Sequence, residues 1–214
     1  QKTIKDSLIY FKLGGVDLTG EQQQQYQSIQ KRLSELTTSY ENNVLDATQS
    51  WQLLLDSETR LKGLPEYAIS MLKQYAEQKS LEGYRVTLDM PCYIAVITYA
   101  DDRDLRKTIY QAFTTRASDQ GFTDKKFDNA ENMIEILQKR QEKAILLEFK
   151  DYAELSIKTK MAENTDEVLT FLNHLAEKSK PAALNEYQQL QEFSQQTELE
   201  DELKAWDVAY YSEK

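Results

Sequence analysis

Apolar and polar residues alternate in one stretch near the middle of the chain, residues 84–90, where one face carries Tyr84, Val86, Leu88 and Met90. A period of two over seven residues predicts a half-buried strand. A second alternating run covers residues 51–56. Because a lone strand leaves its backbone N–H and C=O groups unpaired, we expect the two strands to pair, in a direction that the sequence leaves open. The resulting sheet either tethers helices or offers an edge to an extended peptide.

Elsewhere apolar residues recur at spacings of three and four, which predicts helices. The longest covers residues 20–47, behind a capping box from Thr19 to Gln22, and one stripe along it is apolar: Tyr26, Ile29, Leu33, Leu36, Tyr40, Val44 and Ala47. Residues 93–100 are ambiguous, because their β-branched side chains favour a strand whereas Pro91 favours a helix start; we prefer the helix. The expected fold is a mainly α, elongated multi-helix domain with a small β element at about 51–56 and 84–90.

Further helices are expected over residues 4–13, 65–79, 102–117, 128–149, 151–160, 165–180 and 181–195. Pro181 separates the last two, since proline interrupts a helix interior. In the 128–149 helix the residues expected to face inward are Met133, Ile134, Leu137, Ala144 and Ile145. In the 165–180 helix they are Val168, Leu169, Leu172, Leu175 and Ala176. An acidic cluster at residues 198–202 resembles a helix start, and residues 206–211 begin another element.

The net charge of −10 argues against nucleic acid and anionic membrane surfaces as partners. No apolar run approaches the roughly 18 residues that a membrane span needs. Cys92 is the only cysteine, so an internal disulfide is excluded, which suits a reducing, cytoplasmic location. The sequence starts with Gln1 and shows no targeting segment, and we expect both ends to be points within a longer polypeptide.

Metal chemistry has few candidates here. A hydrolytic zinc site commonly uses two histidines one helical turn apart plus a carboxylate, and His174 is the only histidine. Its place beside a helical apolar stripe favours a structural or surface role. Glycine-rich phosphate loops and serine-nucleophile elbows are also missing from the sequence. We therefore assign no catalytic and no metal-binding residue, and the substrate-binding residues stay unknown.

Two charged stretches have alternative interpretations. Residues 101–104, Asp-Asp-Arg-Asp, could bind a hard cation, but helix capping and charge pairing with Arg103 and Arg106 explain them better. Arg116 lies at a predicted helix end, where its charge suits the helix dipole. It either pairs with Asp119 to hold the turn or contacts a substrate carboxylate, and we prefer the pair.

Several runs together resemble one family, the thimet oligopeptidase family of zinc metallopeptidases, especially its bacterial members. The resemblance extends from about residue 8 to the last residue, and no single run is a chemical signature. The runs are Ile-Gln-Lys-Arg-Leu-Ser-Glu-Leu at 29–36, Asn-Val-Leu-Asp-Ala-Thr at 43–48, Thr-Leu-Asp-Met-Pro at 87–91, Thr-Arg-Ala-Ser-Asp-Gln-Gly at 115–121, Lys-Met-Ala-Glu-Asn at 160–164 and Trp-Asp-Val-Ala-Tyr-Tyr-Ser-Glu-Lys at 206–214.

The resemblance implies a mostly helical peptidase that encloses a deep channel and cuts short peptides. Members hold zinc with a His-Glu-x-x-His helix and a later Glu, and the motif Glu is the general base. That motif is not in this sequence, so the resemblance implies zinc in an intact parent and none in this chain. Residues 1–200 would form a helical channel-wall domain, incomplete at its N-terminus, and residues 201–214 the truncated start of the catalytic domain.

Two functions therefore remain open. The first is a section of a cytoplasmic zinc oligopeptidase, whose partners are the remainder of the same polypeptide and, through the intact parent, short peptides. The 214 residues by themselves would be inactive. The second is a non-catalytic helical module that binds peptides or another protein on its helix faces.

Overall fold

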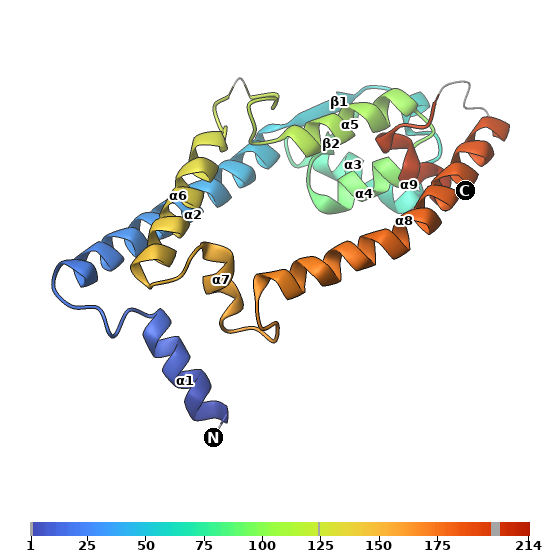
Figure 1. Cartoon of the computed structure of the whole chain (residues 1–214). Helices are drawn as coiled ribbons and strands as arrows, with labels where there is room; N and C mark the ends of the chain where they lie inside the picture. The colour runs from blue at the N-terminus through green and yellow to red at the C-terminus, as the bar shows by residue number, and fades with distance from the viewer. Residues whose placement is uncertain (1, 124, 198–201) are drawn as a thin grey trace. The chain divides into compact units, whose positions relative to one another are not determined.

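The computed structural model describes residues 2–123, 125–197 and 202–214, and within them the chain is mainly helical (Figure 1). Two short strands, β1 (Gln52–Leu55) and β2 (Tyr84–Thr87), form a small sheet, and a 3₁₀ turn, η1 (Glu58–Leu61), follows β1. This confirms the predicted class, mainly α with a small β element. The helices are α1 (Lys2–Leu13), α2 (Glu21–Ser50), α3 (Glu66–Glu77), α4 (Met90–Tyr99), α5 (Arg103–Thr115), α6 (Ala130–Leu146), α7 (Tyr152–Ile157), α8 (Thr165–Gln196) and α9 (Ala205–Glu213).

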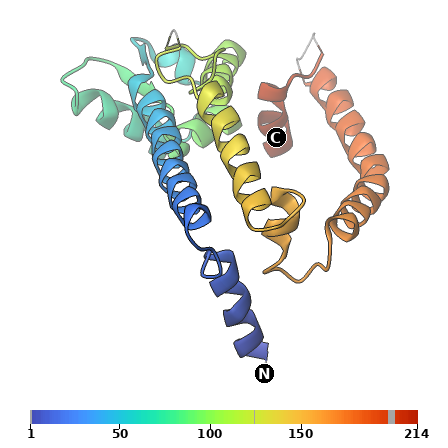
Figure 2. The ribbon, with the colours of Figure 1, turned by 60° about the vertical axis from the view of Figure 1, so that its left-hand side comes forward.

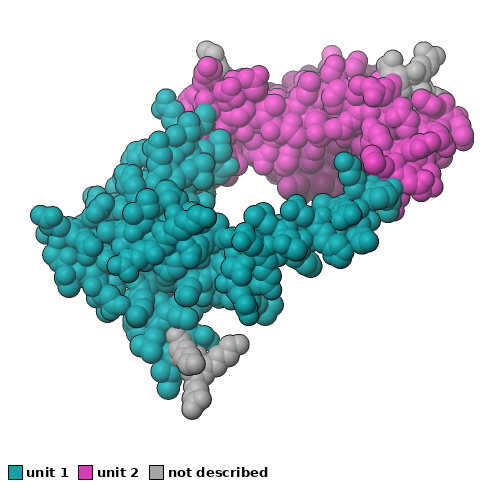
Figure 3. Space-filling model, viewed as in Figure 1, with its two compact units in different colours: residues 1–41, 130–182 teal, residues 42–129, 183–214 magenta. Residues whose placement is uncertain are grey.

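The chain divides into two compact units (Figure 3). Unit 1 comprises residues 1–41 and 130–182, and unit 2 comprises residues 42–129 and 183–214. The long helices α2 and α8 therefore contribute to both units. The expected division at residue 200 concerns a larger protein and stays a prediction. None of the helices in the described ranges is both long and apolar enough to cross a membrane.

In unit 2 the two strands pair antiparallel, with Leu53 opposite Val86 and Leu54 opposite Arg85. This confirms the expected pairing and gives its direction. Gly83 precedes β2 with a φ of +88°, and a Cβ atom there would lie 2.4 Å from the carbonyl oxygen of Leu55. Glycine is required because it has no Cβ to collide and tolerates positive φ.

β2 is shorter than the alternating pattern predicts, because a helix cap takes over its end. The Asp89 carboxylate accepts a hydrogen bond from the backbone N–H of Cys92 at 3.3 Å and caps α4, with Pro91 in the first turn. Leu88 is buried but Met90 is 56% exposed, so the expectation that Met90 completes the strand's buried face is wrong. The same cap confirms the preferred helix over residues 93–100.

The main core of unit 2 lies between the small sheet and the helices α3, α4 and α5. α3 contacts β2, α4 packs against α3, α5 and α9, and α9 also contacts α5. Completely buried apolar side chains fill the space between them, among them Leu72, Val86, Leu88, Val96, Leu105 and Ile109. The apolar stripe of each helix therefore faces this core, as amphipathic helices require. This packing fixes the α4–α5 turn and α9, which together form the site described below.

In unit 1 the first part of α2 runs antiparallel to α6 (Figures 1 and 2). Arg32 donates two hydrogen bonds of 2.6 Å to the Glu135 carboxylate. Towards the end of α2, Asn132 donates to the Ser39 hydroxyl oxygen at 3.2 Å. Towards the start of α2, Lys143 lies over the Tyr26 ring. Residue numbers rise along α2 as they fall along α6, which defines the antiparallel direction.

The predicted division of residues 165–195 into two helices is wrong. α8 is one continuous helix with Pro181 inside it, instead of two helices separated there. Proline removes one backbone hydrogen bond, but the helical turns on both sides keep theirs. Asn164 caps this helix by accepting a hydrogen bond from the backbone N–H of Glu167 at 2.8 Å, as one of the two expected alternatives. The acidic cluster at 198–202 lies, except for Glu202, outside the described residues.

The apolar side chains of α6 do not face a core formed by the described residues, contrary to expectation. Of the five predicted to point inward only Ala144 is buried, and the others are 45–63% exposed: Met133, Ile134, Leu137 and Ile145. On α8 the side chains of Leu169, Leu172 and Leu175 are also half or more exposed. Periodicity identifies the apolar face of a helix correctly but does not tell which segment covers it.

Candidate functional site

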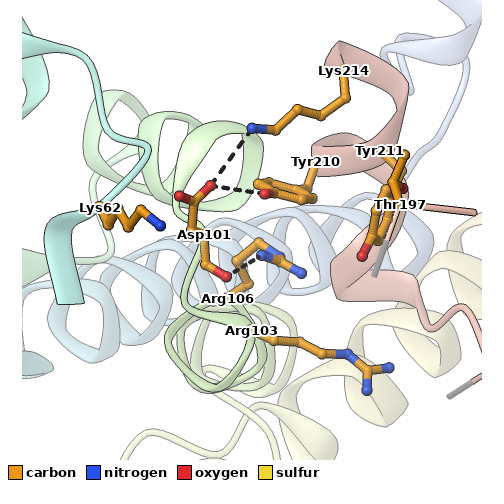
Figure 4. Close-up of a pocket in the computed structure, with 8 residues that line it drawn as sticks. All are labelled: Lys62, Asp101, Arg103, Arg106, Thr197, Tyr210, Tyr211 and Lys214. Carbon is orange, nitrogen blue, oxygen red and sulfur yellow. Dashed lines mark hydrogen bonds and ion pairs between the residues drawn. The ribbon is translucent and has the colours of Figure 1, made fainter. Parts of the chain in front are cut away.

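A polar cavity of about 480 Å³ opens in unit 2 beside the α4–α5 turn and α9 (Figure 4). Four of its lining side chains are cationic, from the η1–α3 loop, α5 and the C-terminal end of the chain. Two tyrosines, a threonine and one aspartate complete the lining. The lining residues are Lys62, Asp101, Arg103, Arg106, Thr197, Tyr210, Tyr211 and Lys214. Charged side chains from several elements of unit 2 therefore line one cavity.

Asp207, in the first turn of α9, binds two of the arginines that line this cavity and is completely buried. Arg103 donates to both carboxylate oxygens at 2.9–3.2 Å, and Arg106 Nη2 donates to Oδ1 at 2.9 Å. The backbone N–H of Lys204 donates to Oδ2 at 3.1 Å. Burial raises the pKa of Asp207, but the hydrogen bonds from Arg103 and Arg106 outweigh it and hold the pKa below its ordinary value.

Arg106 is the most enclosed cation of the site, with 1% of its surface exposed. Its Nη1 donates to the carbonyl oxygens of Ala100 at 2.7 Å and Asp101 at 3.2 Å. Its guanidinium lies 4.0 Å from the centre of the Tyr210 ring, a cation–π contact. Arg103 and Arg106 are three residues apart on α5, so both reach α9 from the same side of the helix.

The other carboxylate of the site belongs to Asp101, in the turn between α4 and α5. The Tyr210 hydroxyl donates to Asp101 Oδ1 at 2.8 Å, and Lys214 Nζ lies 3.6 Å from the same oxygen, as Figure 4 shows. Tyr210 and Lys214 are one helical turn apart at the end of the chain, so both face this turn. Burial, followed by the hydrogen bond to Asp101, raises the pKa of Tyr210.

This arrangement is suited to anchoring and unsuited to proton transfer. A general base needs a carboxylate or imidazole with a free lone pair and a pKa near the working pH. Asp207 is ionised, enclosed and already bonded to two guanidinium groups. The cluster fixes α9 to α5 and to the α4–α5 turn through charge-assisted hydrogen bonds, which are stronger than neutral ones.

The acidic run at residues 101–104 has the capping role that the sequence predicts, but its expected arginine partners bind elsewhere. The Asp102 carboxylate caps α5 by accepting from the Leu105 N–H at 2.9 Å, and it also accepts from Arg60. Arg103 and Arg106 bind the carboxylate of Asp207 instead, more than 100 residues further on. Sequence reasoning missed Asp207. Nothing in the sequence near Arg103 or Arg106 indicates a carboxylate partner so far along the chain.

Arg116 ends α5 as predicted, but it holds the turn through different atoms. Its guanidinium donates to the Phe113 carbonyl oxygen and lies 3.8 Å from the centre of the Phe113 ring. The Asp119 carboxylate accepts from the Gln120 side chain at 3.0 Å, in place of the expected pair with Arg116. The helix-end interpretation of Arg116 is therefore confirmed.

The residues that the structure describes offer no zinc site. His174 is exposed on α8 in unit 1. Cys92 is buried in unit 2, and burial raises the pKa of its thiol to about 11, so it stays protonated. Across the described ranges, the structure brings together no group of three or more His, Cys, Asp or Glu side chains that could hold a metal ion.

Helix α9 and all the lining residues of the cavity except Lys62 lie in the part of the chain that a protein family model matches. The model described as Peptidase family M3 matches residues 96–214, more than half of the chain, and the chain belongs to this family. Oligopeptidase A of Haemophilus influenzae is 49% identical over 214 residues, all of this chain and 31% of that protein. Oligopeptidase A of Escherichia coli is also 49% identical over the whole chain, which covers 32% of it.

The similarity extends to a plant relative. A protein of Arabidopsis thaliana named probable cytosolic oligopeptidase A is 33% identical over 213 residues, with 94% of this chain and 29% of that protein covered. The chain thus spans about a third of the length of the curated relatives it matches.

Proposed function

We propose that this chain is a section of a zinc-dependent oligopeptidase that precedes the catalytic His-Glu-x-x-His helix and forms channel wall and scaffold. The observation that carries the proposal is the continuous match: 49% identity over the whole chain to proteins of which it covers 31–32%. Its membership of Peptidase family M3 supports peptide hydrolysis as the activity of the intact protein.

In this proposal the chain supplies neither zinc ligand nor general base. The sequence contains one histidine, and the His-Glu-x-x-His motif needs two. Zinc would be held by residues outside this sequence, where it would activate a water molecule for attack on a peptide bond. The substrates would be short peptides, and the working location the cytoplasm.

The domain assignment gives the cavity cluster a role within the longer protein. Residues 1–200 would form the helical channel wall, and residues 201–214 would begin the catalytic domain. Asp207 then anchors the first helix of that domain to α5 through Arg103 and Arg106. Two guanidinium groups on one buried carboxylate restrain both the position and the direction of α9.

The test compares the 214-residue chain with the longer polypeptide. Each is purified, its zinc is measured by elemental analysis, and cleavage of an internally quenched oligopeptide is followed. We expect zinc near one equivalent and cleavage only in the longer polypeptide, with activity lost on chelation and restored by zinc. Zinc-dependent cleavage by the 214 residues, or a longer polypeptide that binds no zinc and cleaves nothing, would contradict the proposal.

The second candidate function is a non-catalytic helical module that binds peptides or a protein. The exposed apolar side chains on α6 and α8 are the observation that favours it. Reading the coding frame beyond Lys214 separates the two: a His-Glu-x-x-His motif supports the peptidase and a stop codon supports the module. Calorimetric titration of the chain with short peptides would then measure binding directly.

A further inference from the structure

The antiparallel pair formed by residues 21–41 of α2 and by α6 has two different sides. One side is a polar groove lined by Gln25, Ser28, Ile29, Arg32, Glu135, Lys139 and Glu142. Ion pairs cross or border it, between Arg32 and Glu135 and between Lys139 and Glu142. The hydrogen bonds from Arg32 lower the pKa of Glu135, so its carboxylate stays charged at neutral pH. This side is suited to water.

The other side is an apolar groove of about 290 Å³ between the same two helices. We call it the α2–α6 groove; its lining residues are Thr37, Tyr40, Met133, Ile136, Leu137 and Arg140. Met133 is 45% and Leu137 63% exposed. The Thr37 hydroxyl already donates to the Leu33 carbonyl oxygen of its own helix at 2.7 Å. Thr37 therefore adds little unsatisfied polarity to the groove.

The α2–α6 groove belongs to the unit that is poor in buried apolar groups. The three clusters of buried apolar side chains formed by the described residues all lie in unit 2. Most of the exposed large apolar side chains in the described ranges lie in unit 1. Helices are held in proteins mainly by burying their apolar faces, so unit 1 needs a further apolar surface.

We infer that the α2–α6 groove is covered by an amphipathic helix from the remainder of the polypeptide, completing a three-helix layer. The inference rests on the proposed function in one respect, that the polypeptide is longer than these 214 residues. The relatives support that length, because the chain covers only 29–32% of each of them. A groove between two antiparallel helices presents ridges into which the side chains of a third helix pack.

The test makes one double substitution in two contexts. Met133→Gln together with Leu137→Gln replaces both side chains with a polar one of similar helix propensity, so the helix itself is preserved. We expect the 214-residue chain to change little, since both side chains are already exposed in it. In the longer polypeptide we expect the melting temperature to fall by about 4 °C or more, since buried apolar contacts are lost.

The matched control is Ser28→Gln, which places the same new side chain on the polar groove of the same helix pair. We expect it to leave the melting temperature of both proteins unchanged. An equally small effect of the double substitution in both contexts would overturn the inference, because the groove would then be open to solvent in the longer polypeptide as well.

Two other occupants give different results, and each would also overturn the inference. A second copy of the chain would appear as a dimer of the 214 residues by light scattering, and the double substitution would dissociate it. If the groove instead binds a substrate peptide, the double substitution would leave the melting temperature of the longer polypeptide unchanged and would raise its KM. The melting-temperature difference does not depend on catalysis, so it can be found even if the longer polypeptide proves to have no zinc-dependent activity.

Discussion

At the scale of single residues, Asp207 is the buried carboxylate that binds two arginines in unit 2. It has no exposed surface and accepts hydrogen bonds from Arg103, Arg106 and the Lys204 backbone. Removing one partner of a buried ion pair is costly because the other charges stay buried without compensation. Its importance could not be predicted from the sequence, since nothing local to Arg103 or Arg106 indicates a partner about 100 residues away.

Asp207→Asn should lower the free energy of unfolding by about 3 kcal/mol, because two guanidinium groups lose the negative charge that compensates them. Urea denaturation of the 214-residue chain measures this. Asp104→Asn is the matched control, since Asp104 is an exposed carboxylate in the first turn of α5. It should change the free energy of unfolding by no more than about 0.5 kcal/mol. Equal losses in both variants would show that Asp207 is no special anchor.

The depressed pKa of Asp207 gives the same contribution a pH dependence. Burial raises this pKa, but the hydrogen bonds from the two arginines lower it by more. Protonation of Asp207 therefore favours the unfolded chain, whose aspartate has a pKa of about 3.9. The stabilisation by Asp207 should be complete above about pH 5 and disappear as the pH falls through the folded pKa. Urea midpoints of the parent chain and Asp207→Asn should therefore converge on acidification; a constant difference down to pH 3 would contradict this.

At the scale of elements, the two-stranded sheet of β1 and β2 depends on one glycine. Gly83 has a φ of +88° and lies close to the carbonyl oxygen of Leu55, at the end of the paired strand. The sequence predicts that the two strands exist and pair, because alternation and the need to satisfy backbone groups are local signals. It does not predict where β2 ends. The alternating pattern continues to Met90, but the Asp89 carboxylate accepts a hydrogen bond from the Cys92 N–H and starts α4 there. At Pro181 the local signal for a helix break is likewise overridden, since α8 continues through this residue.

Gly83→Ala should lower the free energy of unfolding by more than about 2 kcal/mol, combining strain at positive φ with a collision between the new methyl group and Leu55. Glu82→Ala, a change at the exposed neighbouring position, serves as the control and should have little effect. The melting temperatures of the two variants of the 214-residue chain are compared. If the two variants melt together, the close approach to Leu55 carries no energetic weight.

At the scale of the whole molecule, burial is distributed unevenly between the two units. The clusters of buried apolar side chains formed by the described residues lie in unit 2, whereas α6 and the first half of α8 expose their apolar faces. Periodicity in the sequence locates those faces correctly. It does not reveal that the described residues leave them exposed, because the periodicity of a helix does not indicate which segment packs against its apolar face.

In the 214-residue chain, backbone amides of β2, α4 and α5 should exchange with deuterium at least tenfold more slowly than those of α6. Exchange requires local opening, and opening is easier where few apolar contacts are lost. Mass spectrometry of peptic fragments measures this directly. Equal protection of α6 and α4 would mean that unit 1 is as stable as unit 2, contrary to the distribution of buried side chains.

The positions of the two tryptophans have a practical consequence for such experiments. Trp51 lies beside Phe122 and Trp206 beside Tyr110, and all four rings belong to unit 2. Intrinsic tryptophan fluorescence will therefore report one half of the chain. If unit 1 opens first, the emission spectrum will stay nearly native while the far-ultraviolet circular dichroism already falls, and the two signals together would separate the transitions without any added label.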